Sequence, residues 1–207
     1  ETDRMFGLFG SSGCSPGSWE WLCATWFAQE CLVRKHDILN GGWCDEQPTG
    51  VMDASAEVYA LSGKSVYAVM RTARSLVSRH IAEDHKIQCD DIDVVNYPRT
   101  MGRRTGILCD TRACGVVYGP TAGTGSGTEI PALIDYDKNS HLPRDKKPRP
   151  IAIMHQVGQR WRVFNQIARA FCDQVTINTT EQTTQGKVAA LCEQFLASKG
   201  YDRFIKA

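Results

Sequence analysis

The chain has 207 residues, of which 42% are hydrophobic and 23% are charged, the composition of an ordinary globular protein. This length fits one substantial domain or two small ones, and no apolar run approaches the ~18 residues that a membrane span needs. The net charge is +1, with 3 Lys or Arg against 9 Asp or Glu in residues 1–60 and 21 against 14 in residues 61–207. The richest basic run, RDKKPR, contains an acid, which argues against a nucleic-acid-binding arm.

The first third of the chain predicts helices. Residues 1–17 are rich in Gly and Ser and predict an irregular segment. Residues 18–34 predict a helix, because one face carries apolar residues at helical spacing, namely Trp19, Leu22, Cys23, Trp26 and Phe27. After a Gly- and Pro-containing loop, residues 53–86 predict a second helical region. Ser62-Gly63 is expected to break it, because Gly inside a helix costs about 1 kcal/mol.

The middle of the chain predicts a sheet. The segments DIDVVNY, GILC, GVVYG, IPALIDY and PIAIMH are short, rich in β-branched residues and bounded by Gly, Pro or Asp, as strands are. Their connections are too short for long helices, so the sheet is expected to be mixed or antiparallel. The Gly-rich segment 119–131 and the Pro-rich segment 141–150 are predicted loops.

The end of the chain predicts a strand at 151–156, a turn, and then a helix pair at 160–176 and 186–199, with Gly200 as the stop. Taken together, residues 1–207 predict a single α+β domain. Its N-terminal helices and its C-terminal helix pair would cover a central mixed or antiparallel sheet.

Nine cysteines are the most unusual feature of the composition. In a secreted chain several of them would form disulfides, whereas in a cytoplasmic chain most would be small buried hydrophobic residues. The single glycosylation sequon, Asn178-Thr179-Thr180, fits a secreted eukaryotic chain. We therefore expect a secreted or virion-associated protein, with a cytoplasmic location as the alternative.

Cys14 and His155 are the candidate catalytic residues. Cys14 lies just before a predicted helix that begins near Ser15 or Ser18, where the helix dipole would lower the thiol pKa. Ser15 is a candidate N-cap, with Pro16 at the first helical position. His155 ends a predicted strand and would act as the base. A Cys at a helix start, followed by aromatic residues and a much later His, resembles the order in papain-like cysteine hydrolases. That resemblance implies a third residue after the His, and Asn165 is the candidate, on a predicted helix.

Two other groups of residues have the side chains of a ligand site. His80, His85, Cys109 and Cys114 have spacings that a Cys₂His₂ zinc site would tolerate. Positions five apart on a helix point in different directions, and the two cysteines equally suit a hairpin disulfide, so no metal and no cofactor is predicted. Arginines around a Gly turn form the candidate anion-binding site, with a solvated loop as the alternative: Arg99, Arg103 and Arg104.

The run PTAGTGSGTE resembles a segment of iron-containing alcohol dehydrogenases. Its successive amides would cradle a phosphate if a helix followed. Because IPALIDY predicts a strand instead, the run is expected to be a flexible hairpin connection.

Two functions follow from these patterns. The first is a thiol hydrolase, a protease-like effector acting on a peptide substrate, with Cys14 as nucleophile and His155 as base. The alternative is a non-enzymatic secreted effector, toxin subunit or virion protein, with structural disulfides and a surface that binds a protein partner. Trp43, in a predicted loop, is its candidate contact residue.

Overall fold

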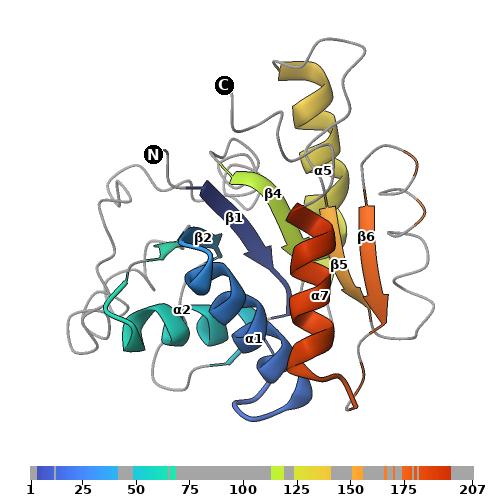
Figure 1. Ribbon diagram of the computed structural model, residues 1–207. Helices are drawn as coiled ribbons and strands as arrows, with labels where there is room; N and C mark the ends of the chain where they lie inside the picture. Colours follow the sequence, from blue (N-terminus) through green and yellow to red (C-terminus); the bar gives the residue numbers. More distant parts are fainter. Residues whose placement is uncertain are drawn as a thin grey trace.

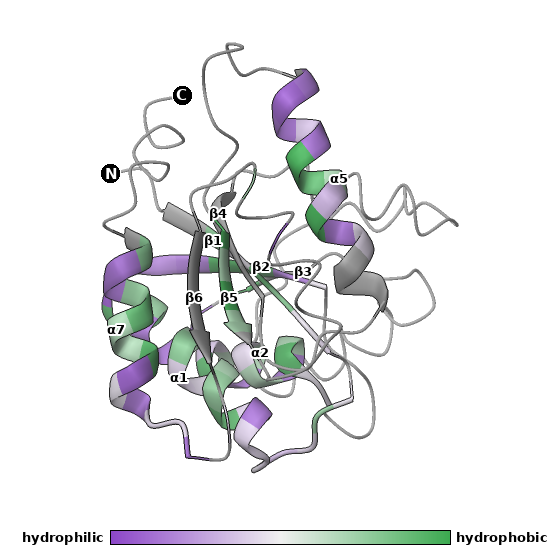
Figure 2. Ribbon diagram, turned by 90° about the vertical axis from the view of Figure 1, so that its right-hand side faces the viewer, coloured by the Kyte–Doolittle hydropathy of each residue, from purple (hydrophilic) through white to green (hydrophobic). Residues whose placement is uncertain are grey.

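A six-stranded sheet forms the centre of the computed structural model, with helices on both of its faces (Figures 1 and 2). The structure describes residues 4–11, 13–41, 49–64, 66–68, 113–118, 124–140, 151–155, 166, 170, 174–178, 180 and 182–196.

The strand order is β3-β2-β1-β4-β5-β6, and every neighbouring pair is parallel. The strands are β1 (Arg4–Phe9), β2 (His36–Asn40), β3 (Tyr67–Ala68), β4 (Ala113–Tyr118), β5 (Ile151–His155) and β6 (Gln174–Asn178). The single domain of mixed helices and sheet is confirmed. The mixed or antiparallel strand direction is wrong, because helices connect β1 to β2, β2 to β3 and β4 to β5, as parallel pairing requires.

The described helices are α1 (Trp19–Val33), α2 (Val51–Leu61), α5 (Thr124–Ser140) and α7 (Gln185–Leu196). Helix α1 and helix α7 confirm the helices predicted at 18–34 and 186–199. Helix α2 stops where Ser62-Gly63 was expected to break it, and Gly63 has a φ of 66° that suits glycine. Between residues 160 and 176, Gln166 and Ala170 are helical, but residues 174–176 belong to β6.

Helix α5 replaces the strand predicted at IPALIDY. Its buried side chains recur at positions i, i+3, i+4 and i+7, which is the spacing of one helix face: Ile130, Leu133, Ile134 and Asp137. Pro131, which with its β-branched neighbours predicted a strand, lies inside this helix. Part of the segment predicted as a loop at 119–131 therefore starts a helix.

Four strands lie where none was predicted. β1 falls in the segment expected to be irregular, β2 follows α1 almost directly, β3 lies in the predicted helical region 53–86, and β6 overlaps the end of the helix predicted at 160–176. The strands predicted at GVVYG and PIAIMH are confirmed as β4 and β5. Those predicted at DIDVVNY and GILC, and the loop predicted at 141–150, lie outside the described residues.

The core has two halves because side chains alternate along each strand. Phe6 and Leu8 of β1 and Met154 of β5 belong to the cluster that α1, α2 and α7 cover. Ile151 and Ile153 alternate with them and face the side on which Figure 2 shows α5. Helix α1 contacts both α2 and α7 and lies between them in Figure 1.

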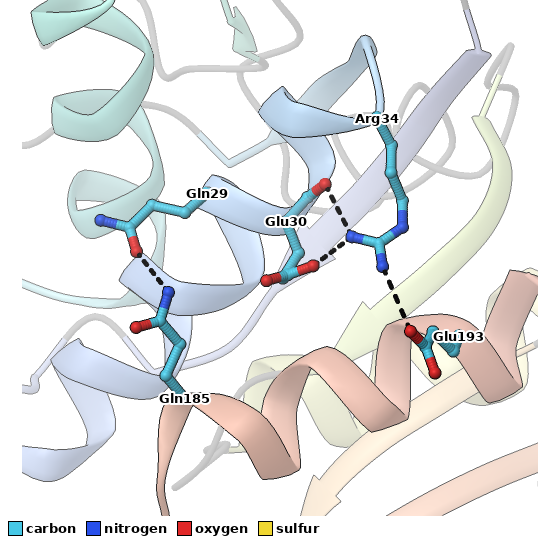
Figure 3. A network of polar contacts seen from close by, with 5 residues as sticks. All are labelled: Gln29, Glu30, Arg34, Gln185 and Glu193. Atoms are coloured by element: carbon cyan, nitrogen blue, oxygen red, sulfur yellow. Dashed lines mark hydrogen bonds and ion pairs between the residues drawn. The ribbon is translucent and has the colours of Figure 1, made fainter.

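Polar contacts join α1 to α7 (Figure 3). Arg34 at the end of α1 pairs with Glu30 one turn earlier and lies 3.9 Å from Glu193 of α7. Further toward the helix starts, the Gln185 amide donates to Gln29 at 3.5 Å. Residue numbers increase in the same direction along both helices from the first contact to the second, so α1 and α7 are parallel.

Candidate functional site: the carboxyl edge of the sheet

All strands end at one edge of the sheet, because all neighbouring pairs are parallel. The pairing aligns Leu8 with Asn40, Phe9 with Tyr118 and His155 with Asn178. β1 and β4 are neighbours, yet the chain leaves β1 for α1 on one face and β4 for α5 on the other (Figure 2). In open α/β sheets, ligands bind outside the carboxyl ends of the strands at such a reversal of strand order.

The segment that follows β1, Gly10–Ser18, is called the β1 loop here. It contains Gly, Ser, Cys and Pro and no charged residue. The Val51 amide donates to the Ser11 carbonyl at 2.9 Å, and the Gly50 amide donates to the Cys14 carbonyl at 2.8 Å. These two bonds attach the β1 loop to the start of α2.

Gly10 permits this attachment. A Cβ atom at Gly10 would lie 2.9 Å from Cγ2 of Val51 and 3.1 Å from its Cβ. The start of α2 therefore packs directly on the backbone where β1 ends. Within the same loop, Gly13, Ser15 and Gly17 are exposed.

The first turns of α1 and α2 each carry an acidic side chain. Ser18 caps α1, with its hydroxyl accepting from the Trp21 amide at 3.3 Å, and Glu20 lies in the first turn. In α2, the fully buried carboxylate of Asp53 accepts from the Thr49 amide at 2.6 Å. Both helix starts thus place an acidic side chain where an incoming anion would otherwise bind.

The start of α5 is different. Helix α5 begins at Thr124 and has no acidic residue in its first turn. The run GPTAGTGSGT, which covers the residues before α5 and its first five residues, contains no charged residue. The sequence prediction that this run lacked a following helix is therefore wrong. Helices α1, α2 and α5 follow β1, β2 and β4. Among these three, only α5 has no acidic residue in its first turn to compete with a bound anion for the N-terminal amides.

Cys14 lies at this edge, but its thiol is not activated. The side chain is 6% exposed, and burial raises the thiol pKa from 9.0 to about 11, with a further contribution from the charge of Glu20. The predicted lowering of this pKa is wrong, because α1 is capped by Ser18 rather than Ser15 and begins only at Trp19. At neutral pH the thiol is protonated and is a poor nucleophile.

We expect Cys14 to react slowly with iodoacetamide in the folded protein at neutral pH, because the reagent needs an accessible thiolate. The Cys14-containing peptide should be labelled at least tenfold more slowly than in the urea-unfolded chain, as measured by mass spectrometry. Equal rates in the two states would contradict the burial of this thiol.

The other candidate residues fall in different places. His155 ends β5 as predicted, paired in register with Asn178, and the description of the structure does not extend to its side chain. The remaining candidates lie outside the described residues. They are the proposed third catalytic residue Asn165, the anion-site arginines Arg99, Arg103 and Arg104, the candidate zinc ligands His80, His85, Cys109 and Cys114, and the candidate contact residue Trp43.

The cysteines within the described residues do not support a disulfide scaffold. Cys14, Cys23, Cys31 and Cys192 are buried thiols and none of them forms a disulfide. Structural disulfides are therefore a wrong prediction for these four positions. They fit the alternative in which a cysteine packs as a small hydrophobic residue.

Sequence reasoning missed the residues that shape this edge, namely Gly10, Ser11, Gly50 and Asp53. The available signal was the apolar run MFGLF directly before a Gly/Ser segment and a helix, which is a strand–loop–helix pattern. Among the described residues, no group of three or more His, Cys, Asp or Glu side chains is arranged to hold a metal ion. In the same part of the chain, no helix is both long enough and apolar enough to cross a membrane.

Comparison with known proteins finds similarity of structure alone. No protein-family model and no curated protein matches the sequence. The molybdenum cofactor carrier protein of Chlamydomonas reinhardtii superposes with a TM-score of 0.57 at 13% identity, over 95% of this chain and 100% of that one. The molybdenum cofactor binding protein of the phototrophic bacterium Rippkaea orientalis gives a TM-score of 0.58 at 10% identity, over 94% and 98%.

These similarities and the buried, protonated Cys14 overturn both functions expected from the sequence. The prediction of a thiol hydrolase is wrong, and so is the prediction of a disulfide-bonded effector, toxin subunit or virion protein. At such low identity the likeness shows a shared fold: this chain has the fold of proteins that are described as carrying or binding the molybdenum cofactor.

Proposed function

We propose that this chain binds a small phosphate-bearing cofactor at the carboxyl edge of its sheet, and that the cofactor is of the molybdenum cofactor class. One observation carries the proposal: the strand order reverses between β1 and β4, where two uncharged Gly- and Ser-containing segments lead into helices on opposite faces. The proposed ligand is thus a small molecule, whereas the sequence predicted a protein partner or a peptide substrate.

The residues at this edge suit such a ligand. The molybdenum cofactor is a pterin that ends in a phosphate group, and phosphates are bound in proteins by backbone amides at helix starts and by hydroxyl groups. The start of α5 offers amides without a competing acid, and the β1 loop offers exposed Gly13 and Ser15 beside it in strand order. We assign the phosphate to the α5 side, because Glu20 and Asp53 on the other side would repel it.

The same edge is poorly suited to a nicotinamide dinucleotide. Those cofactors use a G-x-G-x-x-G turn after the first strand and an acid about 20 residues later, which binds the ribose. Here the turn reads GSSGCSPG, and β2 ends in Asn40. The Asn40 amide is fully buried and donates to the Met52 carbonyl at 3.2 Å and the Ser55 hydroxyl at 3.0 Å, so it holds α2 rather than a ribose.

The variant Thr124→Asp tests this assignment. An acid at the start of α5 is favourable for the helix itself, so the fold should be preserved, but its charge would repel a phosphate bound to the same amides. We expect the Kd for the molybdenum cofactor to rise roughly tenfold, a change of about 1.4 kcal/mol. The measurement is the molybdenum that coelutes with the protein in anaerobic gel filtration over a range of cofactor concentrations.

Asn139→Asp is the matched control. It adds the same charge to the same helix, but near its far end, at an exposed position. The change also removes the hydrogen bond that the Asn139 amide donates to Asp135 at 2.7 Å, so circular dichroism must first show that the variant is folded. This variant should bind the cofactor as the unmodified protein does. Binding that is absent in all three proteins would refute the proposed function, whereas equal binding in all three would refute the assignment of the phosphate to α5.

A further inference from the structure

A pocket lies away from the carboxyl edge, where the second half of α1 meets α7. Phenylalanines from β1, α1 and α7 form its apolar walls, and two thiols, Cys31 of α1 and Cys192 of α7, also line it. The space inside is ≈ 10 Å³, about what one water molecule needs. Both cysteines are 3% exposed.

Neighbouring contacts on each side hold these two cysteines in the same layer of the α1–α7 interface. Arg34, one turn after Cys31, lies 3.9 Å from Glu193, the residue next to Cys192 (Figure 3). Phe195, one turn after Cys192, has its ring centroid 5.3 Å from that of Phe6 across the same pocket. Two cysteines far apart in the sequence thus line one small space.

We propose that Cys31 and Cys192 are a peroxide-sensitive thiol pair that closes to a disulfide linking α1 to α7. One thiol attacks an oxygen of hydrogen peroxide, which breaks the O–O bond and yields a sulfenic acid and one water molecule. The second thiol then attacks the sulfenic sulfur, which forms the S–S bond and releases the second water molecule. Two thiols and one peroxide are consumed, the sulfurs are oxidised and the peroxide oxygens are reduced.

The size of the pocket and the charges around it determine which oxidant reaches the two thiols and how fast they react. Hydrogen peroxide is little larger than water and fits the pocket, whereas oxidised glutathione does not. Burial raises the pKa of Cys192 from 9.0 to about 12, which Arg34 partly offsets while Glu30 and Glu193 add to it. His36 is the other titratable group on the pocket wall. The pair is therefore expected to react more slowly than an exposed thiol.

The test treats the folded, reduced full-length protein with hydrogen peroxide, removes the peroxide, blocks the remaining thiols with N-ethylmaleimide in denaturant and maps non-reduced peptides by mass spectrometry. We expect a cross-linked peptide that joins Cys31 to Cys192 and disappears on reduction. Oxidised glutathione at an equal concentration should give at least tenfold less of it. The melting temperature should rise on oxidation and return to its original value with reductant.

Variants separate a pair from two independent thiols. In Cys31→Ser and in Cys192→Ser the cross-linked peptide must vanish. Dimedone, added together with denaturant after the peroxide has been removed, should trap a sulfenic acid on the cysteine that remains. Cys23→Ser is the control, because Cys23 is fully buried on the same helix but does not line the pocket, and it should keep the cross-link. The proposal is overturned if the two cysteines stay reduced, or if each oxidises to sulfinic acid without a cross-link, while circular dichroism shows a folded protein.

Discussion

Alkaline pH should destabilise this protein strongly, beginning near pH 9. Burial raises the thiol pKa from 9.0 to about 11 for Cys14 and to about 12 for Cys23 and Cys192. Below pH 9.0 both the folded and the unfolded chain hold these protons, so the full stability is present. Above it the unfolded chain releases its protons first, and stability falls as the pH rises through the folded-state values.

The expected loss is large because three thiols act in the same direction. Each tenfold preference for the protonated form corresponds to about 1.4 kcal/mol, so the total is on the order of several kcal/mol. Burial also raises the pKa of Tyr59, whose hydroxyl donates to the His36 carbonyl, and this adds to the loss at the highest pH. Urea unfolding followed by circular dichroism from neutral pH to about pH 12 measures the effect.

A variant identifies the thiols as the cause. Cys23→Ala removes one of the three titrating groups, so the decline in its free energy of unfolding above pH 9 should be shallower than in the unmodified protein. Its stability at neutral pH will be somewhat lower, because a buried side chain is shortened. If the two proteins lose stability in parallel up to about pH 12, buried thiols do not cause the decline.

Gly10→Ala should cost about 1–3 kcal/mol of stability, although it adds a single methyl group. That methyl carbon would lie 2.9 Å from Cγ2 of Val51, closer than carbon atoms approach in proteins. The start of α2 would have to move away, and the bonds that Ser11 and Cys14 accept from α2 would weaken. The free energy of unfolding in urea gives the magnitude.

The partner substitution Val51→Ala makes this test specific. It removes Cγ1 and Cγ2, two of the three Val51 atoms that the new methyl group meets, and leaves Cβ at 3.1 Å. Gly10→Ala should therefore cost less in the Val51→Ala background, by about 0.5–3 kcal/mol. Gly13→Ala is the control in the same loop, because its Cβ would meet Ser11 Oγ at an ordinary 3.6 Å. A Gly10→Ala protein as stable as the Gly13→Ala protein would rule out the close packing between β1 and α2.

The sequence predicts α1 well but not which side of it is buried. Apolar residues recur at helical spacing from Trp19 onward, and the helix begins there. Yet Leu22, part of the expected stripe, is 36% exposed, whereas Trp21 is 5% exposed. The helix is apolar on more than one side, so periodicity locates the element without giving its orientation.

The direction of the strands and the position of the candidate site could not be predicted, because both depend on helix α5, which the sequence pattern did not predict. Pro131 and its β-branched neighbours suggested a strand, and without α5 there was no helix to connect two parallel strands or to bind a phosphate. The position of Cys14 before a helix was recognised correctly. Its burial depends on tertiary packing that local spacing does not reveal, and burial determines its pKa.

The position of β1 in the sheet has a consequence for synthesis of the chain. β1 is made before the other described strands, yet its two neighbours are β2, which begins at His36, and β4, which begins at Ala113. As the chain leaves the ribosome, β1 can pair with β2 as soon as α1 and β2 have been made. The other edge of β1 stays unpaired until about a hundred further residues have been translated, which takes several seconds at ordinary rates. During that time a hydrophobic strand edge is open to other chains. Aggregation during synthesis should therefore depend on how soon β4 emerges.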